Sequence, residues 1–122
     1  MSEIRANTIS DAAGTGPIDL YKQSAAKVWV NYNTITTTSI NGSFNVSSLT
    51  DSGGGVTDVN FSNAFLNTTY ASVGTSNNFH VAIGNTTSST ARSTGFYVSG
   101  TGGQRALYDM SAVGNAYYGD LA

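Results

Sequence analysis

Apolar and polar residues alternate along most of the chain from residue 26 onwards. Three segments show this most clearly, with inward positions at Val28, Val30 and Tyr32, at Thr57, Val59 and Phe61, and at Phe79, Val81 and Ile83. The opposite face carries Lys27, Trp29 and Asn31 in the first segment and His80 in the third. A repeat of two is typical of strands buried on one side, so these segments are predicted to be β-strands.

Turn-forming residues separate the alternating segments. The expected strands cover residues 28–32, 44–49, 57–61, 70–75, 79–84, 95–99 and 105–113. The glycines at 53–55 predict an antiparallel hairpin between the second and third strands, and residues 76–78 predict another between the fourth and fifth. About seven strands at this spacing, without a helical stripe, predict an all-β fold, namely a compact antiparallel β-sandwich or barrel.

Residues 1–23 do not follow this alternation. Their apolar side chains are irregularly spaced, and AGTGP at residues 13–17 suits neither a helix nor a central strand. We expect an extended arm for attachment or oligomerisation, although a frayed terminus is the alternative. The attachment residues of this arm would be Ile4, Ile9, Ile18 and Leu20. Residues 24–122 would then form the β-sandwich domain.

The composition narrows the class of protein. Charged residues make up only 10% of the chain, against about a quarter in ordinary soluble domains. Seven Tyr, five Phe and one Trp argue for a folded core rather than disorder. The five basic residues are scattered and the net charge is −2, so we expect no basic patch that binds the phosphates of a nucleic acid. No apolar run approaches about twenty residues and no leader opens the chain, so we expect neither membrane insertion nor a signal peptide.

The sequence contains no recognisable catalytic or metal-binding pattern. The one histidine, His80, lies within a predicted strand, and there is no G-x-S-x-G elbow. Asp51 and Asp58 flank one loop, where a glycosidase pair or a calcium site are alternatives to the ordinary turn role of Asp. The chain has no cysteine. We therefore expect no enzyme activity, no cofactor and no metal.

Two blocks of sequence carry a resemblance. The first reads IRANTISDAAGTGP at residues 4–17 and KQSAAKVWVNY at 22–32, and the second reads GSFNVSSLTD at 42–51 followed by VNF at 59–61. Together they cover roughly the first 70 residues, and they resemble bacteriophage tail-fibre and virion appendage proteins. The resemblance implies a small β-domain, often trimeric, that is displayed on a virion and sometimes contacts the host surface. The chain departs from long fibres because it has no shaft or repeats.

The expected function follows from these points. We expect a virion structural protein, made in the host cytoplasm, that forms a homotrimer and joins other virion proteins through its arm. A host surface glycan or receptor would meet a surface formed by Asn77, Asn78, Arg92, Tyr117 and Tyr118. Trp29 and Tyr32 are expected in the core or a subunit interface rather than on a sugar. A capsid decoration protein and a free carbohydrate-binding module are the alternatives.

Overall fold

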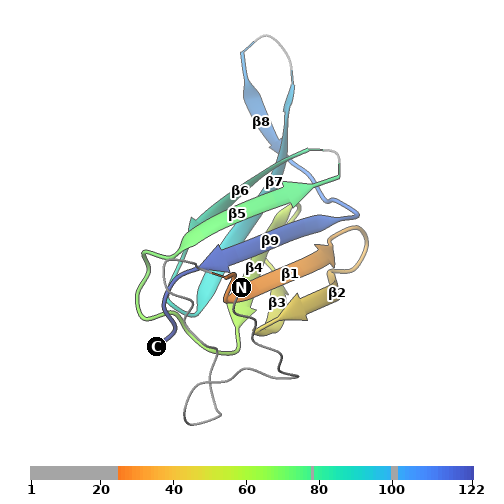
Figure 1. The fold of residues 1–122 in the computed structure, drawn as a ribbon. Coiled ribbons are helices and arrows are strands. Elements are labelled where there is room, and N and C mark those ends of the chain that lie inside the picture. The colour runs from red at the N-terminus through yellow and green to blue at the C-terminus, as the bar shows by residue number, and fades with distance from the viewer. Residues whose placement is uncertain (1–24, 78, 100–101) are drawn as a thin grey trace, which may run out of the picture.

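The computed structural model describes residues 25–77, 79–99 and 102–122, which form strands and no helix. The strands are β1 (Val28–Asn33), β2 (Ser39–Phe44), β3 (Val46–Asp51), β4 (Val56–Phe61), β5 (Ala71–Ser76), β6 (His80–Asn85), β7 (Thr90–Ser99), β8 (Gln104–Leu107) and β9 (Val113–Tyr118). One sheet has the order β2-β1-β9-β5, and the other has the order β3-β4-β7-β6 with β8 paired to β7 (Figure 1). All pairings are antiparallel, so the predicted all-β sandwich is confirmed.

The alternation read from the sequence determines which side chains enter the core. Residues of β1, β4 and β9 are buried at every second position, because successive side chains of a strand point to opposite faces. The buried apolar cluster comprises Val28, Val30, Tyr32, Val59, Phe61, Phe65, Tyr70, Ala91, Met110, Val113 and Tyr117. Phe79, Val81 and Ile83 pack against it as predicted, while His80 is exposed. The hairpin predicted around residues 53–55 is also confirmed by the pairing of β3 with β4.

The expected single strand over residues 44–49 is wrong, because the chain changes sheets at Asn45. This residue has a φ of 57°, a left-handed conformation that Asn tolerates better than most residues do. Its side chain holds the corner: Oδ1 accepts the Asn63 N–H at 2.8 Å, and Nδ2 donates to the Lys27 carbonyl at 3.2 Å. β2 and β3 therefore lie at matching edges of the two sheets.

The expected hairpin between residues 70–75 and 79–84 is also wrong. β5 and β6 belong to different sheets and pack face to face. Gly74 permits this close approach, since a Cβ there would lie 2.9 Å from side-chain atoms of both Val81 and Ile83. A short link between two alternating segments thus connects the sheets here instead of closing a hairpin.

The last expected strand, over residues 105–113, is in fact two. β8 pairs with the far end of β7, and this two-stranded ribbon extends beyond the sandwich (Figure 1). β9 begins only at Val113 and lies between β1 and β5 in the other sheet. These divisions at Asn45 and before Val113 raise the strand count from about seven to nine.

The connections gather at the two ends of the sandwich. Residue 25, the β2–β3 corner, the β4–β5 and β6–β7 links and the C-terminus lie at one end, which we call the terminal end. The β1–β2, β3–β4, β5–β6 and β8–β9 links lie at the other, which we call the distal end. Residues 1–24 therefore join the described fold at the end opposite the distal links.

Candidate functional site

Tyr117 lies in the core and not on a partner surface, which corrects the expectation from the sequence. Its exposure is 0%, and its ring centroid lies 5.1 Å from that of Phe61 and 6.1 Å from that of Tyr70. Burial raises the pKa of its hydroxyl well above the ordinary value of a tyrosine. The Tyr117 ring is therefore a structural element of the sandwich.

The other residues expected on a partner surface are not gathered in one place. Tyr118 is half-buried on the outer side of β9, Arg92 is exposed in the middle of β7, and Asn77 follows β5 at the distal end. Asn77 is bonded there to the β8–β9 link, because its Nδ2 donates to the Ser111 hydroxyl at 2.7 Å. Asn78 and the arm residues Ile4, Ile9, Ile18 and Leu20 lie outside the described residues.

Arg92 is engaged with a carboxylate on its own sheet. Its Nε donates to Asp58 Oδ1 at 2.7 Å and its Nη2 donates to Oδ2 at 2.8 Å, a bidentate pair on the outer face of β4 and β7. These hydrogen bonds lower the pKa of Asp58, and the Ser52 hydroxyl adds to this by donating at 2.9 Å. Asp51 likewise accepts the Gly53 N–H at 3.0 Å. Both carboxylates thus stabilise strands and turns around the loop that they flank.

An exposed apolar row crosses the outer face of the other sheet. Phe44 of β2 lies opposite Trp29 of β1, Trp29 opposite Ala116 of β9, and Ala116 opposite Val73 of β5. Directly opposed residues point to the same face of a sheet, so these four form one continuous row, here called the apolar row. Phe44, Trp29 and Val73 are 53%, 43% and 50% exposed. Such a row across all four strands is typical of a surface that another molecule covers.

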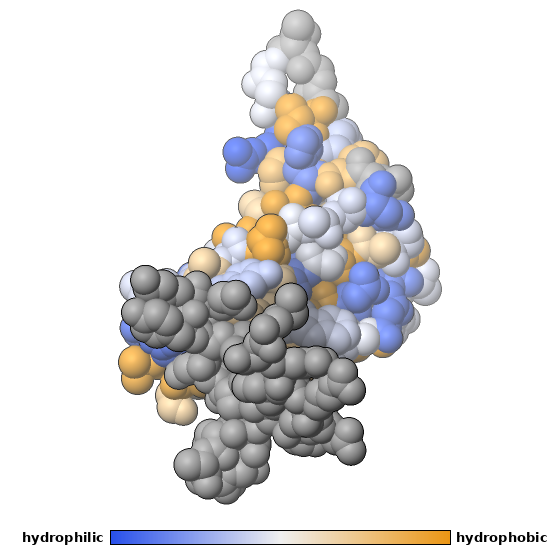
Figure 2. Space-filling model, in the orientation of Figure 1, coloured by the Kyte–Doolittle hydropathy of each residue, from blue (hydrophilic) through white to orange (hydrophobic). Residues whose placement is uncertain are grey.

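The neighbouring row on the distal side is uncharged, while Lys27 lies with Phe44 beside the apolar row on the terminal side. The next row along the strands reads Gly42, Asn31, Gly114 and Thr75. The Trp29 ring leans over Gly42, where an added Cβ would lie 3.5 Å from two ring atoms. Figure 2 views the molecule from this side and shows hydrophobic residues over β5 among polar ones.

The sequence contained a signal for this surface. Trp29 was expected in the core or a subunit interface, and its exposure of 43% rules out the core; its outward position between Lys27 and Asn31 was the signal for this. Phe44 and Val73 could not be added to it, because strand order was unknown. Tyr32, by contrast, is 1% exposed and lies in the core, as expected.

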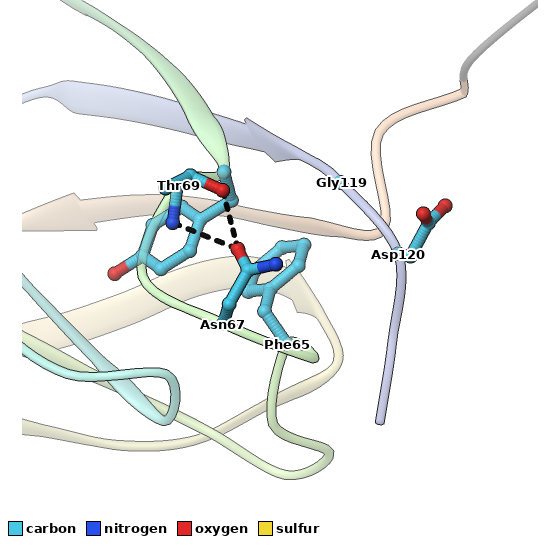
Figure 3. Close-up of a pocket in the computed structure, with 6 residues that line it drawn as sticks. Phe65, Asn67, Thr69, Gly119 and Asp120 are labelled. Atoms are coloured by element: carbon cyan, nitrogen blue, oxygen red, sulfur yellow. Dashed lines mark hydrogen bonds between the residues drawn. The ribbon is translucent and has the colours of Figure 1, made fainter.

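A small hollow of about 170 Å³ occupies the terminal end (Figure 3). Asn67 and Thr69 point toward one another there, and Asn67 Oδ1 accepts both the N–H of Thr69 at 2.9 Å and its hydroxyl at 2.5 Å. The Asp120 carboxylate points away from this pair (Figure 3), while Phe65 and Tyr70 stack in the core with centroids 4.4 Å apart. Asn67 and Thr69 bind each other, so this pair has a structural role.

Comparisons with known proteins do not indicate a function for the chain. No family model, no curated protein and no solved structure matches the chain. Within the described ranges, no three His, Asp or Glu side chains lie close enough together to hold a metal ion. No helix in this part of the chain is long and apolar enough to cross a membrane.

Proposed function

We propose that this chain is a non-catalytic structural module of a bacteriophage particle, in the class of short tail fibres and appendages. The apolar row is the observation that carries the proposal, because Phe44, Trp29 and Val73 remain about half exposed in one continuous row across the sheet. A surface of this kind is stabilised when another subunit covers it. The reason for placing the chain on a virion is that roughly its first 70 residues resemble bacteriophage tail-fibre and appendage proteins.

The partner that fits the apolar row best is another copy of the chain. The two rows described on this sheet contain no charged side chain, and the neighbouring Lys27 is only 9% exposed, so copies can meet there with little charge repulsion. Homo-oligomers usually have closed symmetry, and we propose a homotrimer in which the apolar rows of the three copies face the threefold axis. The other sheet suits a solvent-facing role, since it carries the Asp58–Arg92 pair.

Attachment to the particle is assigned to residues 1–23. The described chain begins at the terminal end of the sandwich, so contacts made by those residues would leave the distal links directed away from the attachment point. Host contact at the distal end is the corresponding part of the proposal. Both roles consist of binding without a chemical reaction. In support of this, Asp51 and Asp58 hydrogen-bond to residues of their own loop and sheet.

Light scattering of the purified full chain tests the assembly. We expect a mass near three times the 12.6 kDa of one chain. Replacing both Trp29→Thr and Val73→Thr should give monomers, because the row loses most of its apolar area. Val98→Thr is the matched control, since Val98 is also 50% exposed but lies on the β7–β8 ribbon. A wild-type monomer, or equal effects of the two changes, contradicts the proposed interface.

Immunoelectron microscopy of particles that carry the chain tests the location. Labelling at the tail or its tip supports the appendage role. Labelling spread over the capsid shell would assign the chain to the capsid decoration proteins instead. Particles without any label, together with free monomers in solution, would contradict the virion proposal and favour a free binding module.

A further inference from the structure

A second hollow, of about 350 Å³, lies at the distal end. Three connections meet there, namely the β1–β2, β3–β4 and β8–β9 links, and the lining residues are Ile35, Thr36, Gly54, Leu107, Tyr108 and Asp109. Its volume is at the lower end of the range of about 300 to 1,000 Å³ that is common for small-molecule sites. Loops held together on a rigid sandwich are a frequent location for ligand recognition.

Tyr108 gives this hollow a rigid aromatic wall. Its ring packs edge to face against Phe79, with centroids 4.9 Å apart, and against Tyr97 at 5.9 Å. Even so, 48% of Tyr108 is exposed. Ile35 and Leu107 extend the apolar lining and are 47% and 55% exposed. The result is a supported ring and two aliphatic side chains that are open to a ligand.

Asp109 supplies a fixed carboxylate beside this wall. Its Oδ1 accepts the Gly55 N–H at 2.6 Å, and within the described residues Oδ2 has no hydrogen-bond partner. Gly55 has a φ of 71°, and a Cβ there would lie 2.6 Å from the Tyr108 nitrogen. Only glycine therefore lets the β3–β4 turn lie against the Tyr108–Asp109 segment, so the backbone positions ring and carboxylate together.

Thr36 completes the lining in a strained conformation. Its φ is 67°, and the Thr37 N–H donates to the Ile35 carbonyl at 2.7 Å, which forms a tight three-residue turn. A β-branched residue at positive φ is an outlier, because its side chain crowds the backbone in that conformation. Strain of this kind often accompanies a functional role, and here it places a hydroxyl-bearing residue at the edge of the hollow.

We propose that this hollow binds a neutral hexopyranose unit of a polysaccharide. The apolar C–H face of a pyranose ring fits against Tyr108, its hydroxyls can donate to Asp109, and Thr36 can donate to or accept from them. The lining has one carboxylate and no basic side chain, so an acidic sugar or a phosphate would be repelled. Assigning the sugar to a host surface rests on the function proposed above, whereas the binding itself does not.

NMR titration of the ¹⁵N-labelled full chain tests the site. The probes are the methyl glycosides of glucose, galactose and mannose, together with N-acetylglucosamine, at millimolar concentrations. We expect at least one probe to shift the amide signals of Thr36, Gly54 and Asp109. Absence of shifts with all four probes overturns the proposal, as do shifts confined to the outer face of β1, β2, β5 and β9.

Variants separate a specific site from a general surface effect. Tyr108→Ala and Asp109→Asn should each weaken binding about tenfold or more, as loss of a central contact does. Asp109→Asn retains an oxygen for the Gly55 N–H, so it should fold, and an unchanged circular dichroism spectrum verifies this. Trp29→Thr is the matched aromatic control and should bind as the wild type does. Full binding by Asp109→Asn overturns the role of the carboxylate.

The two proposals fail independently. A trimer that binds none of the four sugars removes the glycan site and leaves the assembly proposal intact. A monomer that binds a sugar through Tyr108 and Asp109 removes the assembly proposal and supports the glycan site in a free binding module.

Discussion

Adjacent residues Tyr117 and Tyr118 should respond in opposite ways to truncation. Tyr117 is completely buried against Phe61 and Tyr70, whereas Tyr118 is half-buried on the outer side of the same strand. Tyr117→Ala removes a core ring, a change that costs about 3 to 5 kcal/mol in free energy of unfolding. Domains of this size have about 5 to 15 kcal/mol in total, so this loss is a large fraction. Tyr118→Ala should cost about 1 kcal/mol or less.

A third variant separates the ring from its hydroxyl. The Tyr117 hydroxyl accepts a hydrogen bond from Asn115 Nδ2 at 3.3 Å, and the same nitrogen also lies 3.5 Å from the Tyr32 hydroxyl. Tyr117→Phe therefore removes one of two weak acceptors and should cost about 1 kcal/mol. This variant remains informative if Tyr117→Ala does not fold.

Urea unfolding measures these differences, with Trp29 fluorescence and far-ultraviolet circular dichroism as the two signals. The midpoints should fall in the order wild type, Tyr118→Ala and Tyr117→Phe close together, and Tyr117→Ala far below. Equal midpoints for the two alanine variants would refute the burial argument and return Tyr117 to the list of surface candidates. Loss of trimers with an unchanged midpoint would point to the same conclusion.

Three further outcomes are expected. Thr36→Gly should raise the thermal midpoint, because relief of the positive φ is worth about 1 kcal/mol, and an unchanged or lower midpoint would show that Thr36 is not strained. The pKa of Asp58 is lower in the folded chain than its ordinary value of 3.8, so ionised Asp58 stabilises the fold above that pH. This stabilisation is lost as the pH falls through the pKa of the folded state. Asp58→Asn should flatten this acid dependence in melting curves, and an equally steep dependence would argue against the pair with Arg92. Burial raises the pKa of Tyr70 to about 12, so stability should decline as the pH rises from 10 through 12, with Tyr70→Phe flattening the decline.

Local pattern predicted most of the strands, but among their pairings it predicted only the β3–β4 hairpin. The alternation of Val28, Val30 and Tyr32 survives in β1 because one face is buried along its whole length. At Asn45 the alternation of Phe44 with Val46 continues across a corner, so only the distant bonds of Asn45 to Lys27 and Asn63 reveal the change of sheet. These bonds join residues 18 positions apart, and period-two reasoning contains no information about them.

The candidate surfaces were harder to predict for the same reason. Neighbours in the apolar row come from β2, β1, β9 and β5, so Trp29 meets Ala116 across most of the chain length. Tyr117 was expected on the surface because it lies near the C-terminus and outside any strand that the sequence pattern predicted. Its partners Phe61 and Tyr70 are likewise remote in sequence. Side chains that require tertiary neighbours can be assigned only when the strand order is known.

The two faces of the sandwich differ in a way that orients the proposed assembly. On the outer face of the second sheet, Asn60 Nδ2 donates to the hydroxyls of Ser48 and Thr50 at 3.0 Å, and Asp58 binds Arg92, so polar groups satisfy one another without a partner. The apolar row has no such internal compensation, which favours the first sheet as the inner side of a trimer. Packing through a sheet face leaves both ends of each sandwich open. The distal hollow would then remain accessible in the assembled particle, and variants at Tyr108 should impair sugar binding without altering the mass of the oligomer.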